Sequence, residues 1–166
     1  GTTLSSEGSL SLIVTGDVVN HGTIEASGHL ISGGAELVNT GRLNALVDIV
    51  LNFDRIENSG QIQASGNLHA QSRNLSNTGL LQANGSAYLL VEGSLHNTNG
   101  LIRAGQDVLI AADTSGAATN QLLNRSALIV AENGHMAVNA SELINERNTF
   151  ATAGGEVRGD DVIAIQ

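Results

Sequence analysis

The residues best suited to recognition chemistry are the tripeptide Arg158-Gly159-Asp160 near the end of the chain. An integrin would use the Asp carboxylate as a ligand to its own metal ion and the Arg as a charged partner. Residues 151–158 contain two consecutive Gly and are expected to form an insertion that lifts the tripeptide into solvent, where recognition usually resides. Arg158, Gly159 and Asp160 are therefore candidate integrin-binding residues, and a fortuitous turn in a Gly-rich chain is the alternative.

The histidines and acidic residues show no pattern typical of a metal or cofactor site. A zinc site needs ligands at short, regular spacing, which the five His residues lack. The calcium repeat Gly-Gly-x-Gly-x-Asp is matched only superficially by residues 154–161, and its sites form between successive copies. The chain has no Cys to supply thiolate ligands. We therefore expect no cofactor and no structural metal. The His positions are His21, His29, His69, His96 and His135.

The composition excludes several classes of protein and partner. The 166 residues include 20 Gly and 17 Asn but no Pro, Cys or Trp, and the 41% apolar content is almost entirely aliphatic or Ala. Such a sequence favours turns and a narrow core over helices. The net charge of −9 and seven scattered Arg argue against nucleic acid, anionic lipid and sulfated polysaccharide. Apolar runs are only a few residues long, so no membrane insertion is expected, and residues 1–9 lack a signal-peptide pattern.

One pattern recurs along the chain: an apolar residue, Asn, Gly, an aliphatic residue and Ala at alternate positions. The first copy is Val18, Asn20, Gly22, Ile24 and Ala26, and the next three follow at intervals of 19 residues. Later copies are more degenerate. Seven Asn in register are not an accident of composition. They are Asn20, Asn39, Asn58, Asn77, Asn97, Asn124 and Asn145.

The repeat predicts a parallel β-helix. Within each copy inward apolar residues alternate with polar ones, which is the period of a strand. Nineteen residues are too few for a propeller blade, so each copy is predicted to form one coil, whose strands pair with their equivalents about 4.8 Å away. The Asn in register would form an inward ladder, stabilised because neighbouring coils share it; the alternative is that they merely supply turn propensity. The Gly would allow a turn beside this ladder.

The domain organisation follows from the copy spacing. We expect residues 1–166 to form a single shaft segment of about seven to eight coils, with 19–20-residue repeats starting near 16, 35, 54, 73, 93, 119 and 141. The wider spacing after Asn97 predicts an insertion near residues 111–119, and residues 151–158 form a second insertion. In the sixth copy we align Ser126 with the Gly, Leu128 with the inward aliphatic residue and Val130 with the Ala.

Stacked coils would place equivalent outward residues in columns along the helix axis, and these columns argue against an enzyme. A polysaccharide-degrading enzyme needs two acid–base groups within a few ångströms. The column after the aliphatic position has Glu25 as its one carboxylate. A second column contains Asp17, Glu36 and Arg55; Glu36 and Arg55 are expected to form a surface pair of little energetic value. Asp17 and Glu36 could bind a cation, although two exposed carboxylates rarely do.

The Asn-x-Gly-x-[Ile/Leu]-x-Ala core and its period of roughly 20 residues resemble the haemagglutinin repeats of filamentous haemagglutinin and its relatives. These are the large exoproteins of bacterial two-partner secretion, which include the contact-dependent growth inhibition toxins. The resemblance covers residues 16–166 and implies an all-β, single right-handed parallel β-helix. The family's secretion domain has an Asn-Pro-Asn-Gly motif, which this Pro-free chain lacks, so secretion recognition is expected elsewhere.

The function implied by the resemblance is a structural and adhesive shaft segment of a secreted, virulence-associated surface adhesin that mediates attachment to host cells. Its partners would be a host-cell receptor, for example an integrin, and an outer-membrane transporter for the full-length protein. The alternative is a receptor-binding or stalk segment of a contact-dependent growth inhibition toxin, which binds a neighbouring bacterium. A polysaccharide-degrading β-helix enzyme is a third hypothesis, which the columns disfavour.

Overall fold

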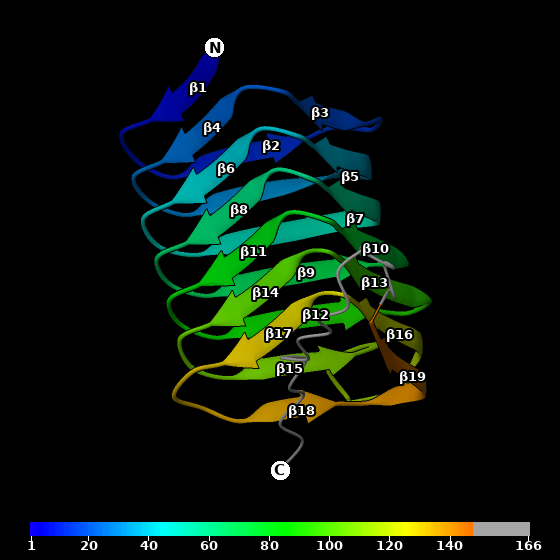
Figure 1. Cartoon of the computed structure of the whole chain (residues 1–166). Helices are drawn as coiled ribbons and strands as arrows, with labels where there is room; N and C mark the ends of the chain where they lie inside the picture. Colours follow the sequence, from blue (N-terminus) through cyan, green and yellow to red (C-terminus); the bar gives the residue numbers. More distant parts are fainter. Residues whose placement is uncertain (148–166) are drawn as a thin grey trace, which may run out of the picture.

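The computed structural model describes residues 1–147, which form a parallel β-helix of about seven turns with about 20 residues each (Figure 1). Strands and their connections make up this range, and it contains no helix. Starting from the N-terminus, the chain runs along the near sheet, turns, and returns along the far sheet, which winds the coils in a right-handed sense (Figure 1). The predicted all-β parallel β-helix is confirmed.

Each coil has three faces, which belong to two sheets. Face 1 is a seven-stranded sheet. Its strands are β1 (Thr3–Ser6), β4 (Thr23–Ala26), β6 (Arg42–Ala45), β8 (Gln61–Ala64), β11 (Leu80–Ala83), β14 (Leu101–Ala104) and β17 (Leu128–Ala131). The second sheet has twelve strands and forms faces 2 and 3, because β5 (Leu30–Asn39) and β7 (Ile49–Asn58) each run through both.

The remaining strands of the second sheet are divided between its two faces. Face 2 contains the first halves of β5 and β7 with β2 (Leu10–Ile13), β9 (Leu68–Ser72), β12 (Ala87–Val91), β15 (Val108–Ala111) and β18 (Met136–Val138). Face 3 contains their second halves with β3 (Val18–Asn20), β10 (Asn74–Asn77), β13 (Ser94–Thr98), β16 (Thr119–Arg125) and β19 (Ala140–Glu146).

Equivalent residues of successive coils lie side by side, so the repeated apolar positions form continuous buried columns. Ile24 pairs with Leu43, and Leu43 pairs with Ile62, which is fully buried. Phe53 is the one aromatic side chain in the buried core of the described range. Its neighbour in the preceding coil is Gly34, where an added Cβ would lie 3.3 Å from the Phe53 ring. The core is thus thin and aliphatic, and it accommodates a ring only where glycine makes room.

The alignment predicted for the sixth copy is wrong by one residue. Leu128 pairs with Leu101 on the outside of face 1 and is 40% exposed, whereas Ile129 takes the inward position and is 3% exposed. Ala131, not Val130, aligns with Ala104. The turns after Asn97 and Asn124 each contain one residue more than the turns of the earlier coils, and after Asn124 the extra residue is Ser126, which has a left-handed φ of 48°. The spacing rule failed because a corner can lengthen while both flanking strands keep their register.

Residues 112–118 form a loop between β15 and β16, within the insertion predicted near residues 111–119. The carboxylate of Asp113 accepts hydrogen bonds from the Ser115 hydroxyl at 2.6 Å and from its backbone N–H at 2.8 Å. These bonds, the hydroxyl first, hold the pKa of Asp113 below its ordinary value. Asn139 Nδ2 donates to the Gly116 carbonyl at 3.0 Å. The loop is therefore tied to the next coil. The second predicted insertion, residues 151–158, lies outside the described residues.

Candidate functional site

The seven Asn in register all lie at the corner between face 3 and face 1, formed by residues 20–23 and their equivalents; we call it the Asn corner. In each pair of neighbouring coils, the Nδ2 of one Asn donates to the Oδ1 of the Asn in the next. Asn20 donates to Asn39 at 2.8 Å, and the pairs that follow measure 2.8, 2.8, 2.8, 2.9 and 3.0 Å. The ladder is therefore unbroken from Asn20 to Asn145.

Burial limits the residue types that can occupy the ladder position. Asn39, Asn77 and Asn97 are fully buried, so their amides cannot use water instead. The Nδ2 of Asn39 also lies 3.3 Å from the Gly41 carbonyl oxygen in its own coil and 3.2 Å from the Gln61 carbonyl oxygen in the next. A buried amide left without partners costs about 1–3 kcal/mol. The position thus requires a short side chain that both donates and accepts, and Asn has this property.

The Gly two residues after each of the first four Asn is required by contact between coils. A Cβ added to Gly41 would lie 2.0 Å from the carbonyl oxygen of Gly22, and a Cβ on Gly60 would lie 2.1 Å from that of Gly41. Gly116 is the one Gly with positive φ among the described residues, so the turn itself does not need Gly here. The sequence predicts the right residue for the wrong reason, because in these coils the preceding coil lies too close for a Cβ.

The glycine backbone forms the floor of a shallow furrow of about 810 Å³ that follows the Asn corner across five coils. The furrow was not predicted from the sequence, although the hydroxyl residues of its first rim recur with the 19-residue period. The first rim carries one residue per coil: His21, Thr40, Ser59, Thr78 and Asn99. The second rim consists of the first face 1 residue of each coil: Thr23, Arg42, Gln61, Leu80 and Leu101.

A second polar corner lies between face 1 and face 2, and it was also not predicted from the sequence. Just before face 2 begins, a side-chain oxygen accepts a hydrogen bond from the backbone N–H of the equivalent residue one coil later. Asp48 Oδ1 accepts from Asn67 N at 2.6 Å, and Asn67 Oδ1 accepts from Ser86 N at 2.9 Å. Ser86 Oγ and Asp107 Oδ1 accept in the same way, at 3.3 and 2.8 Å. We call this the acceptor corner, because each side chain needs only an oxygen.

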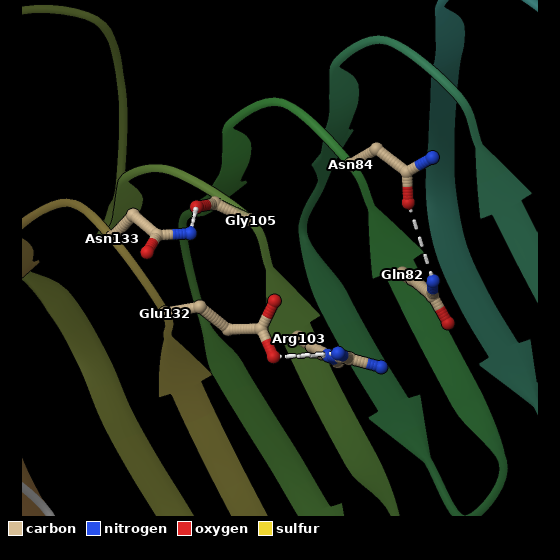
Figure 2. Close-up of polar contacts among 6 residues, drawn as sticks. All are labelled: Gln82, Asn84, Arg103, Gly105, Glu132 and Asn133. Carbon is tan, nitrogen blue, oxygen red and sulfur yellow. Dashed lines mark hydrogen bonds and ion pairs between the residues drawn. The ribbon is translucent and has the colours of Figure 1, made fainter.

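The outward column of face 1 runs Glu25, Asn44, Gln63, Gln82 and Arg103, in the predicted register. Figure 2 shows its C-terminal end, where polar side chains of successive coils surround a hollow of about 240 Å³. The guanidinium of Arg103 reaches across to Glu132, with Nε and Oε1 2.9 Å apart (Figure 2). This carboxylate is therefore held by a cation in a surface ion pair.

The outward column of face 3 contains the predicted surface pair. Arg55 Nε lies 3.1 Å from Glu36 Oε1, and Arg55 also bonds Glu57, which raises the pKa of the guanidinium. Asp17 precedes Val18, which pairs with Leu37, so Asp17 and Glu36 occupy neighbouring coils as predicted. Among residues 1–147, His, Asp and Glu side chains form no group of three or more that could hold a metal ion.

Arg158, Gly159 and Asp160 lie outside the described residues, so the candidate integrin-binding tripeptide stays a prediction from the sequence.

No family model matches the chain, and neither a curated protein nor a solved structure matches it significantly. Within residues 1–147 there is also no helix of the length and apolar character needed to cross a membrane.

Proposed function

We propose that this chain is a structural and adhesive shaft segment of a secreted bacterial surface protein of the haemagglutinin-repeat type. The observation that carries the proposal is the unbroken Asn ladder, which links seven consecutive coils through one repeated residue. Each coil contacts only its neighbours, so stability accumulates coil by coil and the shaft can extend to any length. Such a body suits the display of binding surfaces at a distance from the cell.

The outer surface supports a binding role more than a catalytic one. The Arg103–Glu132 and Arg55–Glu36 pairs bring carboxylates beside guanidinium groups. A glycosidase-type site instead needs two carboxyl groups flanking one bond. In this proposal the protein is exported through an outer-membrane transporter, remains on the cell surface as a filament, and attaches to a host-cell receptor. The tripeptide Arg158-Gly159-Asp160 is its candidate integrin contact.

A cell-attachment assay tests the proposal. The purified chain is immobilised, and the attachment of integrin-bearing animal cells and of bacterial cells is compared with that on an albumin-coated surface. The proposal predicts attachment of animal cells, and it predicts that the Asp160→Glu variant loses the integrin-dependent part while its circular dichroism is unchanged. Attachment of bacterial cells alone would favour the growth-inhibition toxin instead. Attachment of neither would overturn an adhesive role for this segment.

A further inference from the structure

The furrow along the Asn corner presents the same polar group at regular intervals to solvent. Thr40, Ser59 and Thr78 stand on one rim in three successive coils, and all three are exposed. The hydroxyls of Ser59 and Thr78 make no hydrogen bond to any described residue, and neither does the amide of Asn99, which continues the row. These groups are consequently free to donate to a ligand and to accept from it.

The opposite rim changes character along its length. Arg42 donates to Gln61 Oε1 from Nε at 3.2 Å and from Nη2 at 3.0 Å, which leaves the Gln61 amide N–H groups available. Further along, Leu80 and Leu101 are half-buried and offer aliphatic surface. A ligand in the furrow therefore meets hydroxyls and amides on one side, and amide followed by aliphatic groups on the other.

The charge of the furrow selects against ionic polymers. The chain has 16 acidic residues and a net charge of −9, yet no Asp or Glu side chain is among the described residues that line the furrow. Among these described lining residues Arg42 carries the one guanidinium, which donates to Gln61 Oε1. A phosphate- or sulfate-bearing polymer needs clustered cations, which the furrow lacks. A polycation would bind acidic faces in preference to this one. An uncharged polymer is the class that remains.

The spacing of the rim groups further restricts the class of polymer that can bind in the furrow. Coils repeat about every 4.8 Å along the axis, whereas an extended peptide advances about 3.3–3.4 Å per residue and would soon lose register with the row of hydroxyls. A β-linked hexopyranose chain advances by close to one coil per sugar, with hydroxyls at the ring edges and C–H groups on the ring faces. We propose that the furrow binds an extended, uncharged polysaccharide that lies along the helix axis with about one sugar unit per coil. The inference deepens and rests on the proposed adhesive function, because it names the receptor chemistry of one surface of the shaft.

Two matched variants of the whole chain test this site. Ser59→Glu places a carboxylate on the furrow rim, and Ser65→Glu makes the same change in the same coil at the acceptor corner. Both serines are exposed, so neither change should disturb the core. The probes are linear β-linked oligomers of glucose, xylose and N-acetylglucosamine, from dimer to octamer, titrated by calorimetry. Circular dichroism and the unfolding midpoint confirm that each variant is folded.

The site predicts that affinity for at least one of these series rises with length up to the pentamer and then levels off, since five coils line the furrow. Ser59→Glu should weaken the binding at least about tenfold, and Ser65→Glu should leave it unchanged. The proposal is overturned if none of the oligomers binds, or if Ser59→Glu binds them as tightly as the parent. Should immobilised Ser59→Glu still hold animal cells in that case, the adhesive function stands and only the furrow site fails.

Discussion

The Asn corner and the acceptor corner both connect neighbouring coils by side-chain hydrogen bonds, but they differ in burial and in the type of partner. Both join one sheet face to the next and use a short polar side chain to connect each coil to its neighbour. At the Asn corner the side chain is buried, and it must donate to one coil and accept from the other. At the acceptor corner the partner is a backbone N–H, so any short side-chain oxygen serves, and Ser86 stands where the neighbouring coils have Asn67 and Asp107. A buried side chain that must both donate and accept is restricted to one residue type. A partly exposed side chain that only accepts is not.

The largest effect should come from replacing a buried rung of the ladder. Asn58→Leu removes the acceptor of one N–H of Asn39 Nδ2 and the donor to Asn77 Oδ1. Each orphaned group costs about 1–3 kcal/mol, so the loss in free energy of unfolding should exceed that of Gln63→Leu, which alters an outward residue of the same coil. Chemical denaturation of both variants measures the difference. Similar small losses would mean that the ladder contributes little.

The glycines allow a steric comparison of the two corners. In Gly60→Ala the new Cβ meets backbone atoms, the Gly41 oxygen at 2.1 Å and the Thr40 carbonyl carbon at 2.7 Å. In Gly85→Ala it meets the Asn67 Oδ1 at 2.5 Å, a side-chain atom that can move, and backbone only at 3.0 Å. We expect Gly60→Ala to cost about 1–3 kcal/mol or more and Gly85→Ala clearly less. Thermal unfolding of the two variants gives the order, and the reverse order would show that the Asn corner can relax.

A third buried position shows what happens when the partner is missing. Ser72 is 4% exposed, and its hydroxyl has no hydrogen-bond partner within the described residues, whereas the hydroxyl of Ser32 donates to the Leu12 carbonyl at 3.3 Å. Ser72→Ala should therefore leave stability unchanged or raise it by up to about 1 kcal/mol, and Ser32→Ala should lower it slightly. Denaturant midpoints of the two variants decide the sign. A marked loss of stability in Ser72→Ala would contradict this prediction, because it would mean that the hydroxyl forms a stabilising hydrogen bond.

The difference between the two corners also explains which parts of the structure could be predicted from the sequence. The β-helix and the seven Asn were predictable because the buried position tolerates one residue type, which then repeats visibly. The acceptor corner was hidden, since Asp48, Asn67 and Ser86 share a function but not an identity. The sixth coil was misaligned because its longer turn is absorbed by Ser126 and leaves the strands in register.

The candidate binding surfaces were harder to predict than the fold. Outward residues face solvent and carry no packing constraint from the next coil, so each column mixes amide, aliphatic and charged side chains along the axis. The furrow arises because close packing of the coils excludes every Cβ along its floor, and the sequence shows only a row of glycines. The period of the sequence reflects the contacts between neighbouring coils, and it carries no information about the outward side chains that a partner would contact.

The most direct test of the two-corner account is the same amide-to-carboxylate change at both corners of one repeat. Asn58→Asp removes a buried donor and places a carboxylate where the side chain is 2% exposed. Asn67→Asp keeps the oxygen that accepts from Ser86 N, at a corner where Asp48 and Asp107 already fill this role. Unfolding should be measured at neutral pH in roughly 1 M salt, where the Debye length of about 3 Å screens repulsion between Asp48 and the new carboxylate. The account predicts a loss of about 3 kcal/mol or more for Asn58→Asp and less than about 1 kcal/mol for Asn67→Asp. Equal losses in the two variants would contradict it.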